Sequence, residues 1–305
     1  MSIGLVCHFL EQDLSGKLIN TLFEKGLQLN QFNNKKYTND FILSTYLSNL
    51  DNLKNLINKI INIGFKSYRM SSGILPLFDK VDENISNHSK VVEKLKIIGN
   101  IIKTNNLRVS FHPDHFVVLS SEKENVIENS IKDLSYHAWI MDKMELDEST
   151  FYSINIHATG KGKQENVINS IKKLPNNIRK RLTLENDELC SSVKTLYDIY
   201  SKTGVPICFD SHHHVFNTSD LSMEEASEMA ISTWGNVKPI QHLSNTDPIH
   251  DSGNFQNRRK HSDFVHYIPG FQKKLLLTNK ADIDFEFKMK NIAIIDSLKK
   301  FDISL

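Results

Sequence analysis

The chain has 305 residues and a hydrophobic content of 39%, which is enough for one barrel-sized core or two smaller cores. Its formal net charge is +1, so any basic surface for nucleic acid has to be local. The three cysteines, Cys7, Cys190 and Cys208, are too few and too dispersed for a disulfide framework or a cysteine-based zinc site. This composition excludes a disulfide-stapled scaffold and a strongly basic nucleic-acid binder.

The sequence shows no sign of a membrane or secretory segment. No apolar stretch approaches the roughly 18 uninterrupted residues of a membrane span. The opening residues, MSIGLVCH, lack the basic region of a signal peptide and are typical of a first strand. We therefore expect an intracellular protein, and a monomer without an obligate protein partner.

Short β-branched runs alternate with amphipathic stretches along the whole chain. The predicted strands are residues 3–7, 67–70, 108–111, 151–156, 182–184, 206–209, 239–241 and 282–285. The predicted helices include residues 52–63, 91–102, 126–141, 167–174 and 193–200. Eight such units favour a single (β/α)8 TIM-barrel domain over residues 1–305, because closure leaves no sheet edge. A doubly wound open sheet stays possible at this point, since periodicity does not show closure.

Two connections stand out. Residues 11–38 are irregular and predict a loop with one helix. Residues 242–269 are long for a strand-to-helix connection and rich in polar side chains, which is typical of a functional loop.

A histidine or an acidic residue follows or ends six of the predicted strands. These residues are His112, His157, Glu185, Asp210, His242 and Glu286. The carboxyl ends of barrel strands converge on the face that carries active sites. Clustered carboxylates and imidazoles are costly to bury unless a cation neutralises them. The pattern therefore predicts a metal site at the C-terminal face of the barrel.

The donor types narrow the metal and its chemistry. Imidazole and carboxylate without thiolate favour Zn²⁺, Mn²⁺ or Fe²⁺, and the supply of ligands exceeds the need of one tetrahedral ion. We therefore expect two or three ions. We also expect Asp210 to point inward together with one histidine of the following His212-His213-His214 run, and the other two histidines to bond to backbone or solvent. Such centres hydrolyse phosphate esters, and in similar barrels they isomerise sugars, so both reactions stay open here.

Short motifs accompany these residues from the first strand to the last. They are Tyr68-Arg69-Met70-Ser71-Ser72 with Pro76, Phe111-His112-Pro113-Asp114, Ile156-His157, Leu184-Glu185-Asn186-Asp187, Asp210 with His212-His213, His242-Leu243-Ser244, His261-Ser262-Asp263-Phe264, and Glu286 with Lys288 and Lys290. In this order and spacing they resemble the UV damage endonucleases, relatives of endonuclease IV and of the xylose-isomerase-like barrels. The Arg-x-Ser-Ser and His-Ser-Asp-Phe elements favour this family over the isomerases.

The resemblance implies a TIM-barrel enzyme that hydrolyses the phosphodiester 5′ of a lesion and leaves a 3′-hydroxyl. Expected lesions are cyclobutane pyrimidine dimers and 6-4 photoproducts in double-stranded DNA, with abasic sites as a further substrate. Two or three divalent ions are expected, with Mn²⁺ favoured and Zn²⁺ as the alternative. Glu185, Asp210 and Glu286 are assigned as catalytic. The implied ligand set is His112, His157, Glu185, Asp210, His213, His242, His261 and Glu286.

The chain departs from the family pattern in three places. His115 and Phe116 stand where the family has a glutamine and an aromatic residue that probe the duplex, and we expect this pair to form the wedge. Asp79 stands near the position of a further ligand histidine, so either Asp79 serves as a ligand or the third metal position is weaker. Ile240 replaces a lysine seen in some relatives, with Lys238 nearby.

The remaining assignments concern DNA. Basic groups beside the metal site would neutralise phosphates. The residues assigned to DNA and lesion binding are Arg69, Ser71, Ser72, His115, Phe116, Lys161, Lys163, Arg258, Arg259 and Lys260. A sugar isomerase or epimerase would instead have a narrow pocket and no need of basic loops. A non-catalytic damage binder with a partly decayed metal site is the third hypothesis.

Overall fold

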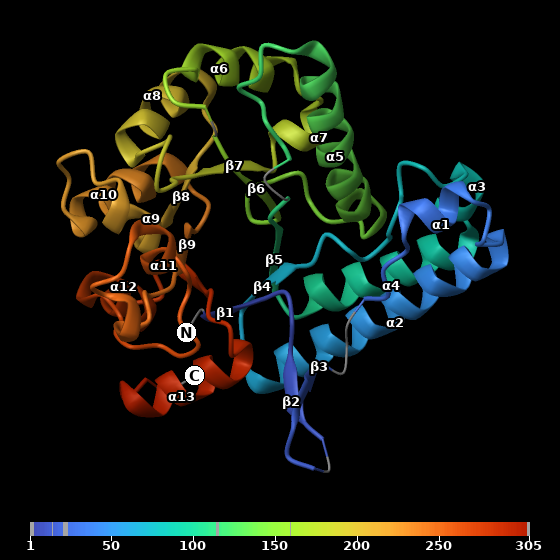
Figure 1. Ribbon diagram of the computed structural model, residues 1–305, viewed down its shortest axis with the longest axis horizontal. Helices are drawn as coiled ribbons and strands as arrows, with labels where there is room; N and C mark the ends of the chain where they lie inside the picture. The colour runs from blue at the N-terminus through green and yellow to red at the C-terminus, as the bar shows by residue number, and fades with distance from the viewer. Residues whose placement is uncertain (1–2, 14, 21–23, 114–115, 159, 304–305) are drawn as a thin grey trace.

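The computed structural model describes residues 3–13, 15–20, 24–113, 116–158 and 160–303, shown in Figure 1. Eight parallel strands close into a barrel in the order β1-β10-β9-β8-β7-β6-β5-β4. Their bounds are β1 (Ile3–Val6), β4 (Ser67–Met70), β5 (Arg108–Phe111), β6 (Ser153–His157), β7 (Leu182–Glu185), β8 (Ile207–Asp210), β9 (Ile240–Leu243) and β10 (Asp282–Phe285).

The barrel closes through β1, which pairs with both β4 and β10. Gly4 lies opposite Ser67 on one side and Asp284 on the other. This closure confirms the TIM barrel and excludes the open doubly wound sheet. Each strand lies within two residues of its predicted bounds, because fully buried strands produce compact β-branched runs between polar connections.

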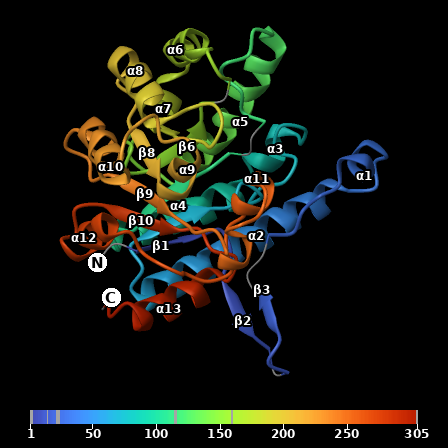
Figure 2. The same cartoon turned by 60° about the vertical axis from the view of Figure 1, so that its left-hand side comes forward.

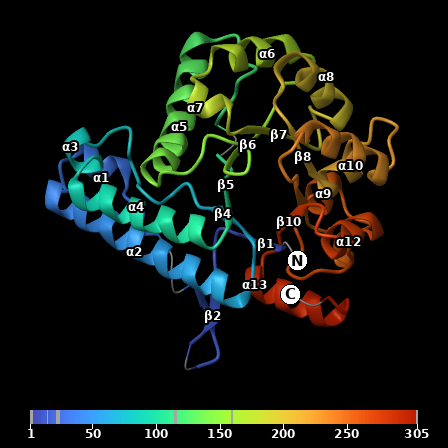
Figure 3. The ribbon, with the colours of Figure 1, turned by 180° about the vertical axis from the view of Figure 1, so that it is seen from behind.

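Helices cover the outside of the barrel (Figures 1 and 3). The helices of eight or more residues are α2 (Asn39–Ile63), α4 (Ser89–Thr104), α5 (Glu124–Lys143), α6 (Gln164–Lys173), α8 (Val193–Thr203), α10 (Met223–Ile231), α12 (Gly270–Leu277) and α13 (Lys290–Lys300). Shorter ones are α1 (Leu29–Asn33), α3 (Glu83–Ser86), α7 (Asn176–Arg179), α9 (Ser211–Phe216), α11 (Phe255–Arg258), η1 (Ser232–Trp234) and η2 (Pro248–His250). In the described part of the chain, no helix is both long and apolar enough to cross a membrane.

Helix α2 begins thirteen residues before the predicted residue 52. The Thr38 hydroxyl caps it by accepting from the Phe41 amide at 3.2 Å. Buried polar residues interrupt the apolar period in the first half of α2. Their side chains form hydrogen bonds within the helix or to distant segments of the chain. Thr45 donates to the Phe41 carbonyl, and Asn49 donates to the Ile74 carbonyl. Propensity and period alone could not anticipate those tertiary bonds.

The irregular segment after β1 contains a hairpin that the sequence did not reveal. Strands β2 (Leu10–Gln12) and β3 (Leu18–Asn20) pair antiparallel and project from the barrel beside α13 (Figure 2). The Asn291 side chain of α13 bonds both the amide and the carbonyl of Leu10. Strands of three residues are too short to show alternation, so tertiary contacts define this hairpin.

Helices α4 and α5 meet through a close backbone approach. A Cβ on Gly99 of α4 would lie 1.8 Å from the carbonyl oxygen of Met144, the residue that ends α5. The glycine therefore sets how closely the two helices pack.

Candidate metal centre

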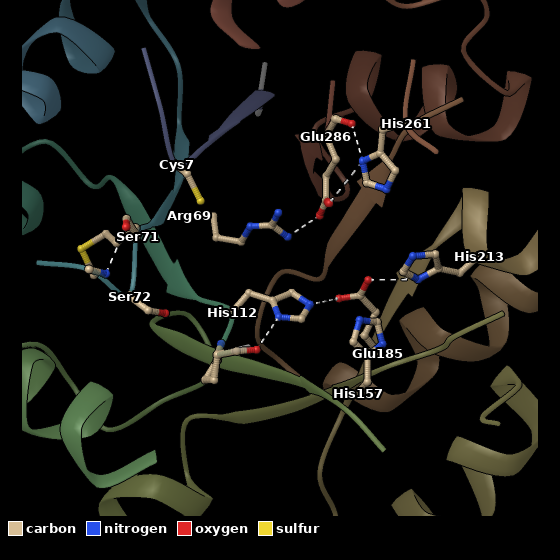
Figure 4. Close-up of a pocket in the computed structure, with 13 residues that line it drawn as sticks. Cys7, Arg69, Ser71, Ser72, His112, His157, Glu185, His213, His261 and Glu286 are labelled. Atoms are coloured by element: carbon tan, nitrogen blue, oxygen red, sulfur yellow. Dashed lines mark hydrogen bonds and ion pairs between the residues drawn. The ribbon is translucent and has the colours of Figure 1, made fainter. Parts of the chain in front are cut away.

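The predicted ligands lie on the ends of neighbouring barrel strands. His157 pairs in register with Glu185, and Asp210 with His242. His112 and Glu286 directly follow β5 and β10. Because these strands are parallel and in register, their terminal side chains converge at one end of the barrel, as Figure 4 shows for His112, His157, Glu185 and Glu286.

Glu185 is the centre of this cluster and is 1% exposed. Its Oε2 lies 3.0 Å from His112 Nε2 and 3.1 Å from His242 Nδ1. Its Oε1 lies 3.3 Å from His213 Nδ1. One carboxylate therefore contacts histidines from three different parts of the chain: the connection after β5, strand β9 and helix α9.

Glu286 is the second carboxylate at the mouth. Its Oε1 lies 2.9 Å from His242 Nδ1 and also accepts from Arg69. Its backbone carbonyl accepts a hydrogen bond from His261 Nδ1 at 2.7 Å. Glu286 therefore connects His242, Arg69 and the long connection that carries His261.

Among the described residues, two groups made of imidazole and carboxylate donors alone converge closely enough to share cations, and a third joins the Cys208 thiol to Glu185 and His242. The first is His112, His157 and Glu185, and the second is Glu185, Asp210, His242 and Glu286, with the donor atoms of each group within 4.8 Å of one another. Glu185 belongs to both. The chain therefore places two ligand groups side by side with a common carboxylate, as a two-metal site requires.

Three histidines are oriented so that Nε2 could bind a cation. Their Nδ1 atoms donate to backbone carbonyls: His112 to Pro113 at 3.1 Å, His213 to Asn186 at 2.9 Å, and His261 to Glu286. A carbonyl can only accept, so each neutral ring keeps its lone pair on Nε2. In His112 that lone pair faces the Glu185 carboxylate, and a cation between the two acceptors would remove the conflict.

Buried polar atoms without a hydrogen-bond partner also indicate a cation site. His157 Nδ1, Asp210 Oδ2 and His242 Nδ1 are buried and make no hydrogen bond of good geometry. Such groups are costly to bury unless a cation or a hydrogen bond compensates them. The donor set therefore fits divalent ions of the imidazole- and carboxylate-binding kind.

The charges at the mouth perturb each other strongly. Burial alone raises the pKa of Glu185, but the surrounding imidazoles, His242 first among them, hold the pKa of this carboxyl well below its usual range. Burial lowers the pKa of His213, yet Asp210 and Glu185 outweigh it and raise that pKa well above its usual range. Cations that bind here must displace protons from imidazoles.

The three histidines after β8 separate as expected. The amide of His213 donates to Asp210 Oδ1 at 2.7 Å, and the ring lies at the mouth. His212 and His214 instead donate from Nε2 to the carbonyls of Arg259 and Leu221. Only His213 of this run lines the mouth pocket.

Two asparagines to which the sequence analysis assigned no role in the site, Asn155 and Asn186, support the ligands. Asn155 donates from Nδ2 to Glu185 Oε2 and accepts from Thr183. The Asn186 side chain bonds both backbone groups of Asp210. Asn155 precedes His157 by two residues, so strand alternation alone could have placed both on the inner face.

The ligands open into a pocket of about 490 Å³ that Arg69, Ser71 and Ser72 also line. Arg69 lies deep in it, bonded to Glu286. Ser71 accepts from the Gly73 amide, and the Ser72 hydroxyl bonds His137 Nε2 at 2.9 Å. Hydrogen bonds within the protein therefore hold these three side chains in the lining of the pocket.

Asp79 lies away from the ligands. It forms an exposed pair with Lys80 at 2.6 Å and lines a second cavity of about 390 Å³, which Phe116 also borders. Phe116 is 73% exposed, whereas His115 lies outside the described residues. The cluster therefore forms without Asp79.

The basic residues assigned to DNA lie on the connections that surround the mouth. Lys161 is exposed, and Lys163 pairs with Glu122 at 3.0 Å. The Arg258 and Arg259 guanidinium groups stack over Phe216 and Phe255 at 5.5 and 5.8 Å. Arg259 also lies 3.3 Å from Glu188, and Lys260 donates to Asn257. Lys163, Arg258, Arg259 and Lys260 therefore already contact other side chains of the protein.

Known proteins share both the sequence pattern and the barrel. The sequence profile of the family described as UV-endonuclease UvdE matches residues 2–304. The UV DNA damage endonuclease of Clostridium perfringens is 31% identical over 283 residues, which cover 89% of this chain and 67% of that protein. The UV DNA damage endonuclease of a Nostoc species is 32% identical over 256 residues, covering 82% and 76%.

Solved structures agree. The crystal structure of SacUVDE superposes with a TM-score of 0.81 at 28% identity, over 100% of both chains. D-Psicose 3-epimerase from Clostridium cellulolyticum H10 has a TM-score of 0.53 at 13% identity, over 77% of this chain and 79% of that one, and this likeness shows the barrel fold alone. The profile and the relatives confirm the resemblance drawn from the motifs: the chain belongs to the UV-endonuclease UvdE family.

Proposed function

We propose that this protein is a DNA repair endonuclease that hydrolyses the phosphodiester 5′ of UV photoproducts in double-stranded DNA. Cyclobutane dimers and 6-4 photoproducts are the proposed lesions, with abasic sites as further substrates. The observation that carries the proposal is Glu185, one buried carboxylate shared by two groups of ligand atoms. Membership of the UvdE family supplies the class of substrate.

The residues fit two or three divalent ions, with Mn²⁺ favoured over Zn²⁺. One would be held by His112, His157 and Glu185, and a second by Glu185, Asp210, His242 and Glu286. His213 and His261 complete the proposed ligand set. Bound ions would supply Lewis acidity at the scissile phosphate and lower the pKa of water toward neutrality.

The chain's own side chains have separate roles in this proposal. Arg69 orients the Glu286 carboxylate, and Asn155 holds Glu185 from below. Phe116, which is exposed on the connection after β5, would probe the base stack, while Lys161, Arg258 and Lys260 would contact phosphates. Such phosphate contacts position the strand and make binding sensitive to salt. We propose that a monomer suffices for these contacts.

Nicking of ultraviolet-irradiated supercoiled plasmid tests the proposal. We expect relaxation of irradiated plasmid in Mn²⁺, none in chelator, and little on unirradiated plasmid. Equal nicking of both plasmids would exclude damage specificity. A 5′-labelled duplex with one defined dimer then locates the cut, and extension of the fragment by a polymerase shows the 3′-hydroxyl.

A further inference from the structure

The connections after β5 and β9 lie on opposite sides of the metal mouth. The closed strand order places β5 and β9 diametrically across the barrel. The β5 connection carries Phe116, and the β9 connection carries Ile249, which is 80% exposed. Two exposed large apolar side chains therefore lie on connections that leave opposite strands of the barrel.

The segment that presents Ile249 is a built turn. The Asp247 carboxylate accepts a hydrogen bond from the Ile249 amide at 3.1 Å, and the backbone carbonyl of Asp247 accepts one from the His250 amide at 2.7 Å. Pro248 begins η2, where its ring restrains the backbone. The tip is therefore ordered before any partner binds, which lowers the entropy lost on binding.

The return of the chain from this tip is equally constrained. The Gly253 amide donates to the His250 carbonyl at 2.8 Å, and a Cβ on Gly253 would lie only 2.9 Å from that oxygen. Thr246 forms an isolated bridge with His261 at the base of the loop. Because His261 lines the mouth pocket, the base of the loop that carries Ile249 is attached to a residue of the candidate metal centre.

The same connection offers charge that matches DNA. Arg258 ends α11, and Arg259 and Lys260 follow it directly in the connection from β9 to α12. An exposed isoleucine alone is ordinary. Here the isoleucine lies at the tip of a hydrogen-bonded turn, and three cations follow it on the same connection. This combination fits duplex DNA, whose stacked bases are apolar and whose phosphates are anionic.

We propose that Ile249 is a second wedge, which enters the base stack of the damaged duplex from the rim opposite Phe116. This inference rests on the proposed function and adds a residue for lesion recognition. Apolar side chains that enter a base step partly unstack it and kink the duplex. A damaged step yields most easily, so two opposed wedges would favour damaged over intact DNA.

Base unstacking can be measured without incision. A duplex with 2-aminopurine opposite a single thymine dimer is titrated with protein in chelator, and saturation is checked by anisotropy. We expect a fluorescence rise with the wild type and, at the same saturation, at most about half of that rise with Ile249→Ala, because one of two wedges is lost. An undiminished rise in Ile249→Ala would overturn the proposal.

Incision provides the second readout. We expect Ile249→Ala to cut a fully paired dimer duplex about tenfold more slowly than the wild type, and Ile249→Leu to recover most of the rate. The defect should shrink to within about twofold when the bases opposite the dimer are mismatched, because that duplex is already partly unstacked. Equal slowing on both duplexes would show that Ile249 acts in another way and would overturn the wedge.

Leu277→Ala is the matched control. Leu277 is 55% exposed and ends α12 just before β10 begins, so it lies at the opposite face of the barrel. It should match the wild type in both assays, and a defect equal to that of Ile249→Ala would remove the support for a wedge. The proposed function fails separately, if wild-type protein does not cut the dimer duplex.

Discussion

The Arg69 guanidinium donates to the Glu286 carboxylate, which joins the end of β4 to the residue that follows β10 across β1. The two side chains are 11% and 10% exposed. Removing one partner of a buried ion pair leaves the other charge uncompensated. This pair therefore ties the stability of the barrel mouth to the carboxylates of the candidate metal centre.

Arg69→Gln should destabilise the metal-free protein by about 3 kcal/mol. In Mn²⁺ the loss should be smaller, because a bound cation can compensate Glu286 in place of the guanidinium. Denaturant unfolding in chelator and in Mn²⁺ measures both values. Lys180→Gln, which removes an exposed pair with Glu148, should cost less than about 1 kcal/mol in either condition. An equal loss of stability from Arg69→Gln with and without Mn²⁺ would show that the Arg69–Glu286 pair does not interact with the metal centre.

Glu185→Gln should lower incision of irradiated plasmid by about 10³-fold. The amide keeps the shape of the side chain and an acceptor for Asn155, but it removes the charge shared by both ligand groups. Elemental analysis should show less bound metal, while circular dichroism stays unchanged. Glu93→Gln, on the exposed side of α4, provides the control. Full activity in Glu185→Gln would refute the assignment of the metal centre.

His137 should make the fold sensitive to acid. Burial lowers its pKa from 6.5 to about 4, and its Nδ1 donates to the Asp133 carbonyl while Nε2 accepts from Ser72. The folded state therefore favours the neutral ring. Its contribution is fully present above pH 6.5 and is lost as the pH falls toward 4, because the unfolded chain takes up the proton first.

The measurement compares the pH dependence of unfolding in the wild type and in His137→Gln. Between pH 6.5 and 4 the wild type should lose up to about 3 kcal/mol more than the variant. Parallel pH profiles would show that His137 does not contribute to acid sensitivity.

Gly99→Ala should destabilise the protein by about 2 kcal/mol, although alanine is the better helix former. The added methyl group would meet the Met144 carbonyl, a backbone group that cannot rotate away without moving α5. Thermal unfolding measures the effect. Gly270→Ala, at the first residue of α12 with nothing within 4 Å, should be neutral or slightly stabilising, and similar losses in both variants would contradict the packing argument.

The sequence by itself determined the barrel and the set of strand-end residues. Buried parallel strands need continuous apolar runs, and a polar residue at the end of such a run can only lie at the mouth. His112, His157, Glu185, Asp210, His242 and Glu286 were located by that rule. Their spacing and flanking residues also sufficed to identify the family.

Only the tertiary structure decided which of these residues meet, and what else holds them. Glu185 lies at the junction of two ligand groups because the strand register places it beside His157 and across from His242, and register is not written in any local pattern. The same holds for Arg69, assigned to DNA from its motif but bonded to Glu286 in the fold. Local sequence sets the period and direction of each element, whereas contacts between distant elements follow from closure of the barrel.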